Sequence, residues 1–233
     1  TQVGGFNQAF RSLIPESVAG ANADASFEMK ALSLEQKVGT GTYLGLAGEW
    51  LESEVDRQVG VINYRFPFPL TPAQTREALD YDERTALFSV NQLFGNEWSL
   101  GARYRLSEAR LRDDFLEVPP SVVLVNGARP HSRVQALLHQ VNLFLQYNHP
   151  SGFFGQVQGL WNGQNNHGYA GTRPGDSFWQ FNTFAGYRFP RRRAEITVGV
   201  LNLTDKDYQL NPLNLTPELP RARTLVASFR FYF

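Results

Sequence analysis

The chain has 233 residues, of which 13% are aromatic, and its acidic and basic side chains balance to a formal net charge of zero. This length suits one domain, and the neutral charge gives no electrostatic reason to expect nucleic acid as a partner. Cysteine is absent, which excludes disulfides, a cysteine metal site and a thiol nucleophile. No apolar run reaches the roughly 18 residues of a transmembrane helix.

The N-terminal part of the chain predicts one hairpin. Residues 1–11 are a strand or the end of a preceding element, and residues 12–25 carry the breakers of a loop. Residues 26–38 and 42–56 are long strand candidates joined by a short glycine turn, which indicates a hairpin.

A long, proline-containing connection is expected next, over residues 57–82. Within it, Thr71 precedes Pro72 as an N-cap residue precedes the first helical position, so residues 71–80 predict a short helix. A second hairpin follows, formed by residues 83–94 and 97–110. In its second strand one face is apolar and the other carries Arg103 and Arg105, which is the period of a strand.

Two further hairpins and a last strand complete the chain. The expected segments are a connection over 111–132, strands over 133–148 and 152–165, a loop over 166–175, strands over 176–189 and 194–204, a loop over 205–219, and a strand over 220–233. The last strand alternates strictly, with Leu225, Ala227, Phe229, Phe231 and Phe233 on one face.

Short turns therefore alternate with long loops along the whole chain. Transmembrane barrels show this asymmetry, with short periplasmic turns and long extracellular loops. The strand candidates are long enough to cross a bilayer, and aromatic residues cluster near their ends. We count nine strands, or about ten with residues 1–11, and expect an all-β, antiparallel transmembrane β-barrel.

The C-terminal stretch resembles the end of a TonB-dependent receptor barrel of a Gram-negative outer membrane. The resemblance is carried by the run N-L-T-D-K-D-Y from Asn202 to Tyr208, by P-R-A-R-T from Pro220 to Thr224, and by the final aromatic residue, Phe233. It implies that Asn202, Asp205 and Tyr208 belong to a family motif. It also implies that the barrel-assembly machinery reads a signal formed by Leu225, Phe229, Phe231 and Phe233.

The resemblance implies a cell outer-membrane location and a part in uptake of a siderophore, vitamin or saccharide. That family has about twice as many strands and an N-terminal plug. Residues 1–233 are therefore expected to be the C-terminal portion of a larger barrel, contacting outer-membrane lipid and partnered by a plug or periplasmic domain that this chain does not contain. The alternative is an export pore or a membrane anchor attached to a periplasmic repeat domain. We expect no enzymatic activity, no cofactor and no bound metal.

Several polar residues are candidates for a binding, metal or catalytic site. Lumen arginines (Arg103, Arg105, Arg188 and Arg230) are expected to be solvated or to pair internally, with Glu49 and Glu195 as candidate counter-charges, rather than to guide an anion. The basic turn at Arg191–Arg193 is expected to be solvated. His149 and Ser151 have the spacing of a lipase-type pair but fall in a short turn, and the oxygens of Asn202, Asp205 and Asp207 are too few for a calcium loop. A soluble β-sandwich is the structural alternative.

Overall fold

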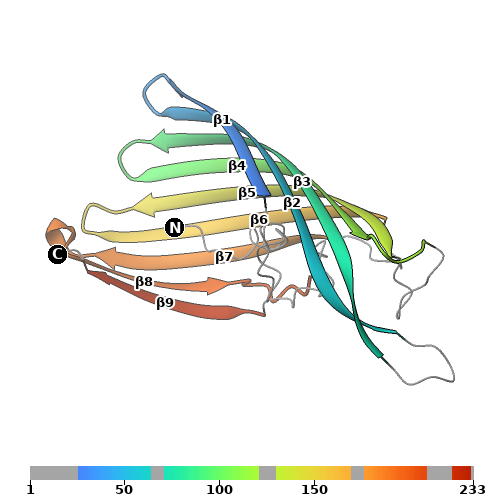
Figure 1. Ribbon diagram of the computed structural model, residues 1–233. Coiled ribbons are helices and arrows are strands. Elements are labelled where there is room, and N and C mark those ends of the chain that lie inside the picture. The colour runs from blue at the N-terminus through green and yellow to red at the C-terminus, as the bar shows by residue number, and fades with distance from the viewer. Residues whose placement is uncertain (1–25, 64–70, 121–129, 169–175, 209–221, 232–233) are drawn as a thin grey trace.

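The computed structural model describes residues 26–63, 71–120, 130–168, 176–208 and 222–231. In this part of the chain nine strands form one antiparallel sheet, and each strand pairs with its neighbours in sequence. The strands are β1 (Ser26–Val38), β2 (Thr42–Asn63), β3 (Thr71–Phe94), β4 (Trp98–Phe115), β5 (His131–Asn148), β6 (Phe153–His167), β7 (Ser177–Arg188), β8 (Ala194–Leu201) and β9 (Thr224–Phe231). The all-β, antiparallel fold expected from the sequence is confirmed (Figure 1).

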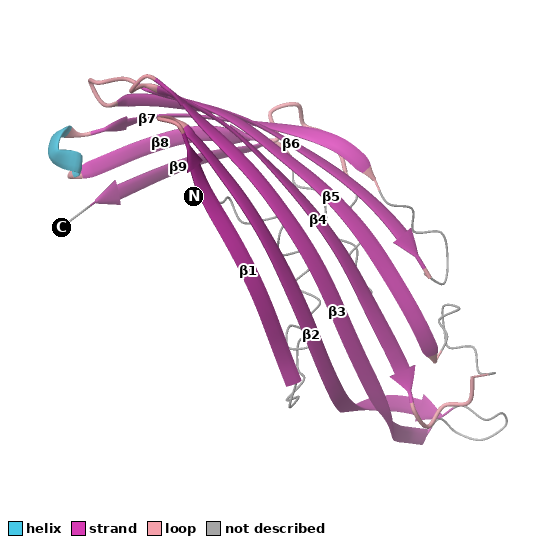
Figure 2. Cartoon of the chain, turned by 90° about the horizontal axis from the view of Figure 1, so that it is seen from above, coloured by secondary structure: helices cyan, strands magenta, loops and turns pink. Residues whose placement is uncertain are grey.

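The sheet is curved, so it has an outer, convex face and an inner, concave face (Figure 2). Because successive residues of a strand point to opposite faces, the register assigns each side chain to one of them. On β3, the buried side chains of Glu77, Leu79 and Tyr81 define the inner face, and Arg76 and Asp80 lie on the outer face.

The alternation of short and long connections is also confirmed. Short turns join β1 to β2, β3 to β4, β5 to β6, and β7 to β8, the last through a 3-10 turn at Pro190–Arg192. The other four connections lie at the opposite end of the sheet, which we call the long-loop end (Figure 1).

Two predicted connections are much shorter than expected, and the predicted helix over residues 71–80 is wrong. Strand β2 continues to Asn63 and β3 begins at Thr71, so this part of the predicted 57–82 connection is a paired hairpin. The register places Val59 opposite Thr75 and Val61 opposite Ala73. The strand pairing between β2 and β3 and the inward packing of β3 side chains decide the structure of this segment. They override the local helix-capping signal at Thr71-Pro72.

The connection predicted over residues 111–132 is also shorter in the structure, because the strands on both sides of it are longer than expected. Strand β4 runs to Phe115, and β5 begins at His131. At the C-terminal side the differences are small: β8 ends at Leu201 rather than residue 204, and β9 begins at Thr224 rather than residue 220.

The sheet is not closed within the described residues. Strand β1 pairs only with β2, and β9 pairs only with β8. The strand considered for residues 1–11 lies outside the described residues. Within the described ranges, no helix has the length and apolar character needed to span a membrane.

Candidate functional site

An apolar belt crosses the outer face of all nine strands. It occupies the part of each long strand that lies nearer the short turns. On β4 it runs from Trp98 to Leu106, roughly the 9–11 residues of a tilted transmembrane strand. Every strand contributes exposed apolar side chains, for example Leu32, Leu46, Phe88, Leu100, Leu143, Val157, Phe181, Val198 and Leu225. Continuous apolar exposure on this scale is typical of a surface that contacts lipid or another protein.

Aromatic side chains border the belt on both sides. Towards the short turns, Trp98 packs against Tyr147 with ring centroids 4.5 Å apart, and Phe153 meets Tyr187 at 4.8 Å. At the other border lie Trp50, Trp161 and Trp179, and the Trp161 indole donates to Ser177 Oγ at 3.2 Å. Two aromatic residues near strand ends, which a girdle expected from the sequence would include, lie on the inner face instead.

These two exceptions are Tyr43 and Phe154, which the register turns towards the inner face. Each meets a cation there: Lys37 Nζ lies 5.6 Å from the Tyr43 ring centroid, and the Arg188 guanidinium lies 4.2 Å from that of Phe154. The expectation that they belong to an interfacial girdle was therefore wrong.

The expected assembly-signal residues lie on the last strand of the belt. Leu225, Phe229 and Phe231 point outward and pair with Val200, Ile196 and Ala194 of β8. Phe229 and Phe231 contact each other at 4.1 Å between ring centroids. Phe233 lies outside the described residues.

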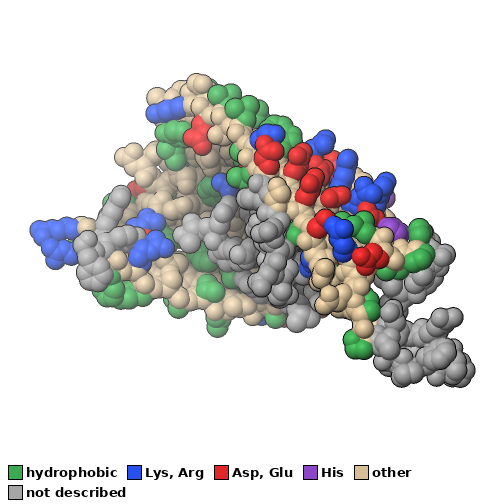
Figure 3. Space-filling view, in the orientation of Figure 1, with side chains coloured by type: hydrophobic (Ala, Val, Ile, Leu, Met, Phe, Trp, Pro, Cys, Tyr) green, Lys and Arg blue, Asp and Glu red, His purple; other side chains and the backbone are tan. Residues whose placement is uncertain are grey.

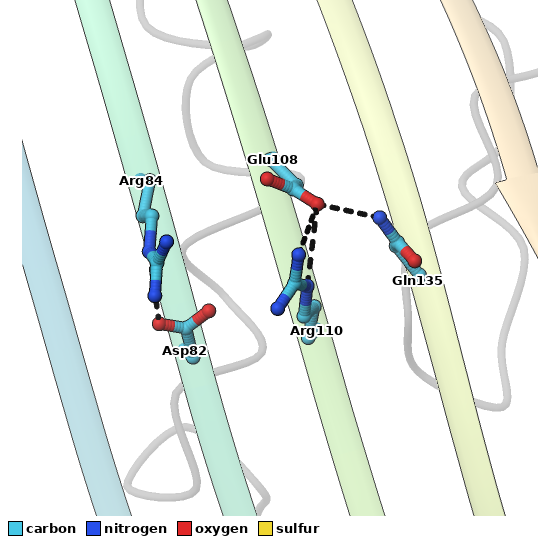
Figure 4. Close-up of polar contacts among 5 residues, drawn as sticks. All are labelled: Asp82, Arg84, Glu108, Arg110 and Gln135. Carbon is cyan, nitrogen blue, oxygen red and sulfur yellow. Dashed lines mark hydrogen bonds and ion pairs between the residues drawn. The ribbon is translucent and has the colours of Figure 1, made fainter.

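Beyond the belt, the outer face changes abruptly to charged side chains. Figure 3 shows acidic and basic groups gathered over the part of the sheet away from the short turns. Arg84 pairs with Asp82 at 3.6 Å, and Glu108 accepts from Arg110 at 2.7 Å and from Gln135 at 2.5 Å (Figure 4). The sequence analysis did not predict this zone, although it placed Arg84, Glu108, Arg110 and Gln135 on strands and only Asp82 in a connection.

Towards the β2–β4 side, the inner face carries paired charges. Arg105 Nη2 lies 3.7 Å from Glu83 Oε1 and 3.8 Å from Glu49 Oε2, and Arg105 and Glu83 are largely buried. On β7, Arg188 donates to Glu195 at 2.9 Å and to Asn148 at 2.7 Å. The expected internal pairing is confirmed for Arg105 with Glu49 and for Arg188 with Glu195.

Towards β5–β7, the inner face carries amides in place of charges. Gln158 donates to Asn142 and accepts from Asn182, each at 3.1 Å, and Gln140 donates to Asn162 at 2.9 Å. This amide ladder crosses three strands and is buried at Asn162 and Asn182. It gives the inner wall a neutral, hydrogen-bonding character.

A carboxyl pair lies on the inner face near the long-loop end. Glu77 forms an ion pair with Arg57, and Asp113 faces Glu77. Asp113 Oδ1 is buried and has no hydrogen-bond partner within the described ranges. Burial and the charge of Glu77 raise the pKa of Asp113 to about 7, against an ordinary value of 3.8. The pair therefore keeps one proton at mildly acidic pH and has lost about half of it near pH 7.

Residues 202–208 form a clamp where the chain leaves β8. Asn202, which is 2% exposed, accepts from the backbone N–H of Lys206 at 2.9 Å and donates to its carbonyl at 3.1 Å. Its own N–H donates to Asn182 Oδ1 at 2.9 Å, which ties the clamp to the amide ladder. Asp205 Oδ1 accepts from the backbone N–H of Arg223 at 2.6 Å, just before β9 begins.

Backbone geometry explains why these residue types stand in the clamp. Asn202 and Asp205 have φ values of 49° and 52°, in the left-handed region that asparagine and aspartate tolerate better than most residues. The motif thus connects two strands by local hydrogen bonds. Within the described ranges no three metal-ligating side chains gather, here or elsewhere.

His149 and Ser151 do approach each other, with Nδ1 and Oγ 2.7 Å apart. The same Nδ1 accepts from the backbone N–H of Ser151 at 3.2 Å, and the backbone closes the turn from His149 N–H to the carbonyl of Phe153. No described carboxylate or amide contacts the other ring nitrogen of His149. This exposed contact is typical of a turn, and a nucleophile's base would need an orienting third group.

No protein-family model, curated protein or solved structure matches the chain.

Proposed function

We propose that this chain forms part of the wall of an outer-membrane β-barrel of the TonB-dependent receptor kind, which takes part in uptake of a nutrient. The observation that carries the proposal is the apolar belt, which is present on all nine strands and gives way to charged side chains on the same face of β2 to β5. An outward apolar band with aromatic borders around a polar interior is the pattern of transmembrane barrels.

The inner wall supports a passage for a polar solute. Several of its charges are paired with one another, as in Arg105 with Glu83 and Arg188 with Glu195, and its amides form a ladder of hydrogen bonds. Such a wall offers donors and acceptors without a strong net charge, which favours a neutral, hydroxyl-rich solute such as a saccharide over a small anion. The uptake role itself rests on the resemblance at Asn202–Tyr208 and involves no chemical step.

Strands β1 and β9 each have one edge that is unpaired within the described sheet, and a closed barrel needs both edges to be paired. Unpaired backbone groups are very costly in hydrocarbon, so both edges must find a partner strand in a membrane. In this proposal the partner strands belong to the same receptor, outside the described part of the sheet.

The test is gel mobility of the detergent-refolded chain before and after boiling, combined with flotation on lipid vesicles. Co-flotation and a resistance of the vesicle-bound chain to alkaline extraction are expected. A chain that remains soluble and monomeric without detergent would contradict the proposal. A fast-migrating band that slows on boiling would show that this chain closes alone, which favours a small pore or anchor over a receptor fragment.

A further inference from the structure

Three phenylalanine rings from β5, β6 and β7 lie on the inner face, and each covers a glycine of a neighbouring strand. The pairs are Phe144 with Gly101, Phe154 with Gly186, and Phe184 with Gly199. A Cβ atom at any of these glycines would overlap the ring that covers it. Glycine therefore allows each ring to lie against the backbone of the next strand, which fixes the position of the ring on the inner wall.

Two of the three rings are open towards the interior. Phe144 and Phe184 are half-buried, and no described cation or aromatic ring stacks on either of them. Phe154 differs, because the Arg188 guanidinium lies 4.2 Å from its ring centroid and covers it. Only Phe144 and Phe184 therefore offer a ring face to a ligand.

The two open rings stand on either side of a pair of glutamines on β6. Phe144 is the register partner of Gln158, and Phe184 is that of Gln156. Because neighbouring strands lie about 4.8 Å apart, the two rings are roughly 10 Å apart across β6. Gln158 belongs to the amide ladder, whereas the half-buried Gln156 makes no side-chain hydrogen bond with a described residue. We call these four residues the aromatic–amide platform.

The surroundings of the aromatic–amide platform are electrically neutral. The next register partners along the wall are also amides, Gln146 beside Gln156 and Asn182 beside Gln158. On the inner face of the described parts of β5, β6 and β7, Arg188 is the one charged side chain, and it pairs with Glu195 at 2.9 Å. An anionic solute would therefore find no unpaired cation on this part of the wall.

A neutral sugar chain matches this combination of groups. The C–H groups on one side of a pyranose ring suit the negative face of an aromatic ring. Its hydroxyls both donate and accept hydrogen bonds, and an amide side chain offers a donor and an acceptor in return. Two separate ring faces with amides between them suit successive sugar units better than a single planar solute, which would occupy only one face.

We propose that the aromatic–amide platform is a binding subsite for a neutral oligosaccharide. One sugar ring stacks on Phe144 and another on Phe184, and their hydroxyls form hydrogen bonds with Gln156 and Gln158. Because the aromatic rings are already fixed over glycine, little side-chain freedom is lost when the sugar binds. This inference rests on the proposed function, since it requires the inner wall to line a passage.

The experiment measures binding of maltotetraose to the detergent-refolded chain by saturation-transfer difference NMR, in a detergent without a sugar headgroup. Phe144→Leu and Phe184→Leu remove the flat ring but keep an apolar side chain over the glycine. Each should weaken binding by roughly two- to tenfold, the range expected for one aromatic stacking contact. Gln156→Leu should weaken it by a similar factor, because a hydrogen bond contributes about as much. Flotation on vesicles checks that each variant is still folded and inserted.

The matched control is Phe154→Leu, the same substitution at the third ring of the wall. Arg188 already covers this ring and keeps Glu195 and Asn148 as partners when the ring is lost. Binding of maltotetraose should therefore be unchanged in this variant.

Three outcomes would overturn the inference while the proposed function stands. The first is wild-type affinity in both Phe144→Leu and Phe184→Leu, which would leave these rings a packing role only. The second is tighter binding of adenosine than of maltotetraose, which would favour a planar solute. The third is a wild-type chain that floats with vesicles but does not bind maltotetraose. A wild-type chain that does not float with vesicles contradicts the proposed function and this inference with it.

Discussion

The ring of Tyr208 stacks on the ring of Phe178, with centroids 4.7 Å apart and planes 18° apart. Phe178 is an inward residue of β7, and both rings are buried. The stack holds the far end of the clamp against the inner wall, where Asn202 and Asn182 hold its near end.

Replacing Tyr208 with alanine should therefore detach residues 202–208 from the sheet. Loss of a buried aromatic ring costs about 3 kcal/mol, and the stack with Phe178 disappears with it. Limited proteolysis of the refolded chain should show faster cleavage between β8 and β9. Tyr208→Phe keeps the ring and should remain as resistant as the wild type; equal protection of Tyr208→Ala would show that the stack does not hold the loop.

Asn202→Ala should weaken the same clamp through its hydrogen bonds. The substitution leaves the partly buried N–H and carbonyl of Lys206 without their side-chain partner, which costs about 0.5–1.5 kcal/mol for each hydrogen bond. Alanine is also strained at a φ of 49°. The urea midpoint of the refolded chain measures the loss. Asp207→Ala, an exposed neighbour, is the control and should have no effect.

Sequence periodicity predicted the half of the sheet where one face is apolar and the other polar. It failed where both faces carry polar groups, as on β3, where Glu77 points inward and Arg76 and Asp80 point outward. In such a strand the apolar alternation disappears, and local signals such as Thr71-Pro72 dominate the prediction. In the structure this segment is nevertheless a strand, because its residues continue to pair with those of β2.

The sequence predicted only part of the candidate site. The run from Asn202 to Tyr208 was recognised as a motif, but its partners Asn182 and Phe178 lie on another strand, and nothing local in the sequence pairs them. The charged zone of the outer face was not predicted either, because it depends on cross-strand pairs such as Asp80 with Arg112, and residues 57–82 and 111–132 were expected to be connections.

Val157→Arg tests whether the belt faces lipid. Val157 is outward on β6 and 55% exposed, so in a water-soluble sheet an arginine there would change stability little. Facing hydrocarbon, it should cost about 2–4 kcal/mol. Urea unfolding of vesicle-inserted chain measures the difference. Asn165→Arg, on the same strand and face but beyond the belt, should be nearly neutral; equal effects of the two variants would exclude a lipid-facing belt.

Deletion of Phe233 tests the proposed assembly signal. Leu225, Phe229 and Phe231 lie in the belt on β9, and Phe233 continues their alternation in sequence. The deletion should lower the fraction of chain recovered in the outer membranes of cells, measured by membrane fractionation after alkaline extraction. Spontaneous refolding in detergent should be nearly unchanged, because it uses no assembly machinery. Normal assembly in cells would count against Phe233 as a signal.

Asp113→Asn should remove a pH dependence of stability. The folded chain keeps the Asp113 proton up to about pH 7, because burial and Glu77 raise its pKa, whereas the unfolded carboxyl loses its proton near 3.8. The folded state thus binds more protons between these values, and stability falls as the pH rises from about 4 to about 7. An asparagine cannot ionise, so the variant should lose this slope and be more stable than the wild type at pH 8. Urea midpoints at pH 5 and pH 8 measure both effects, with Asp207→Asn as the exposed control. A variant that keeps the wild-type slope would show that the proton resides on another group, with Glu77 the next residue to substitute because it shares the pair.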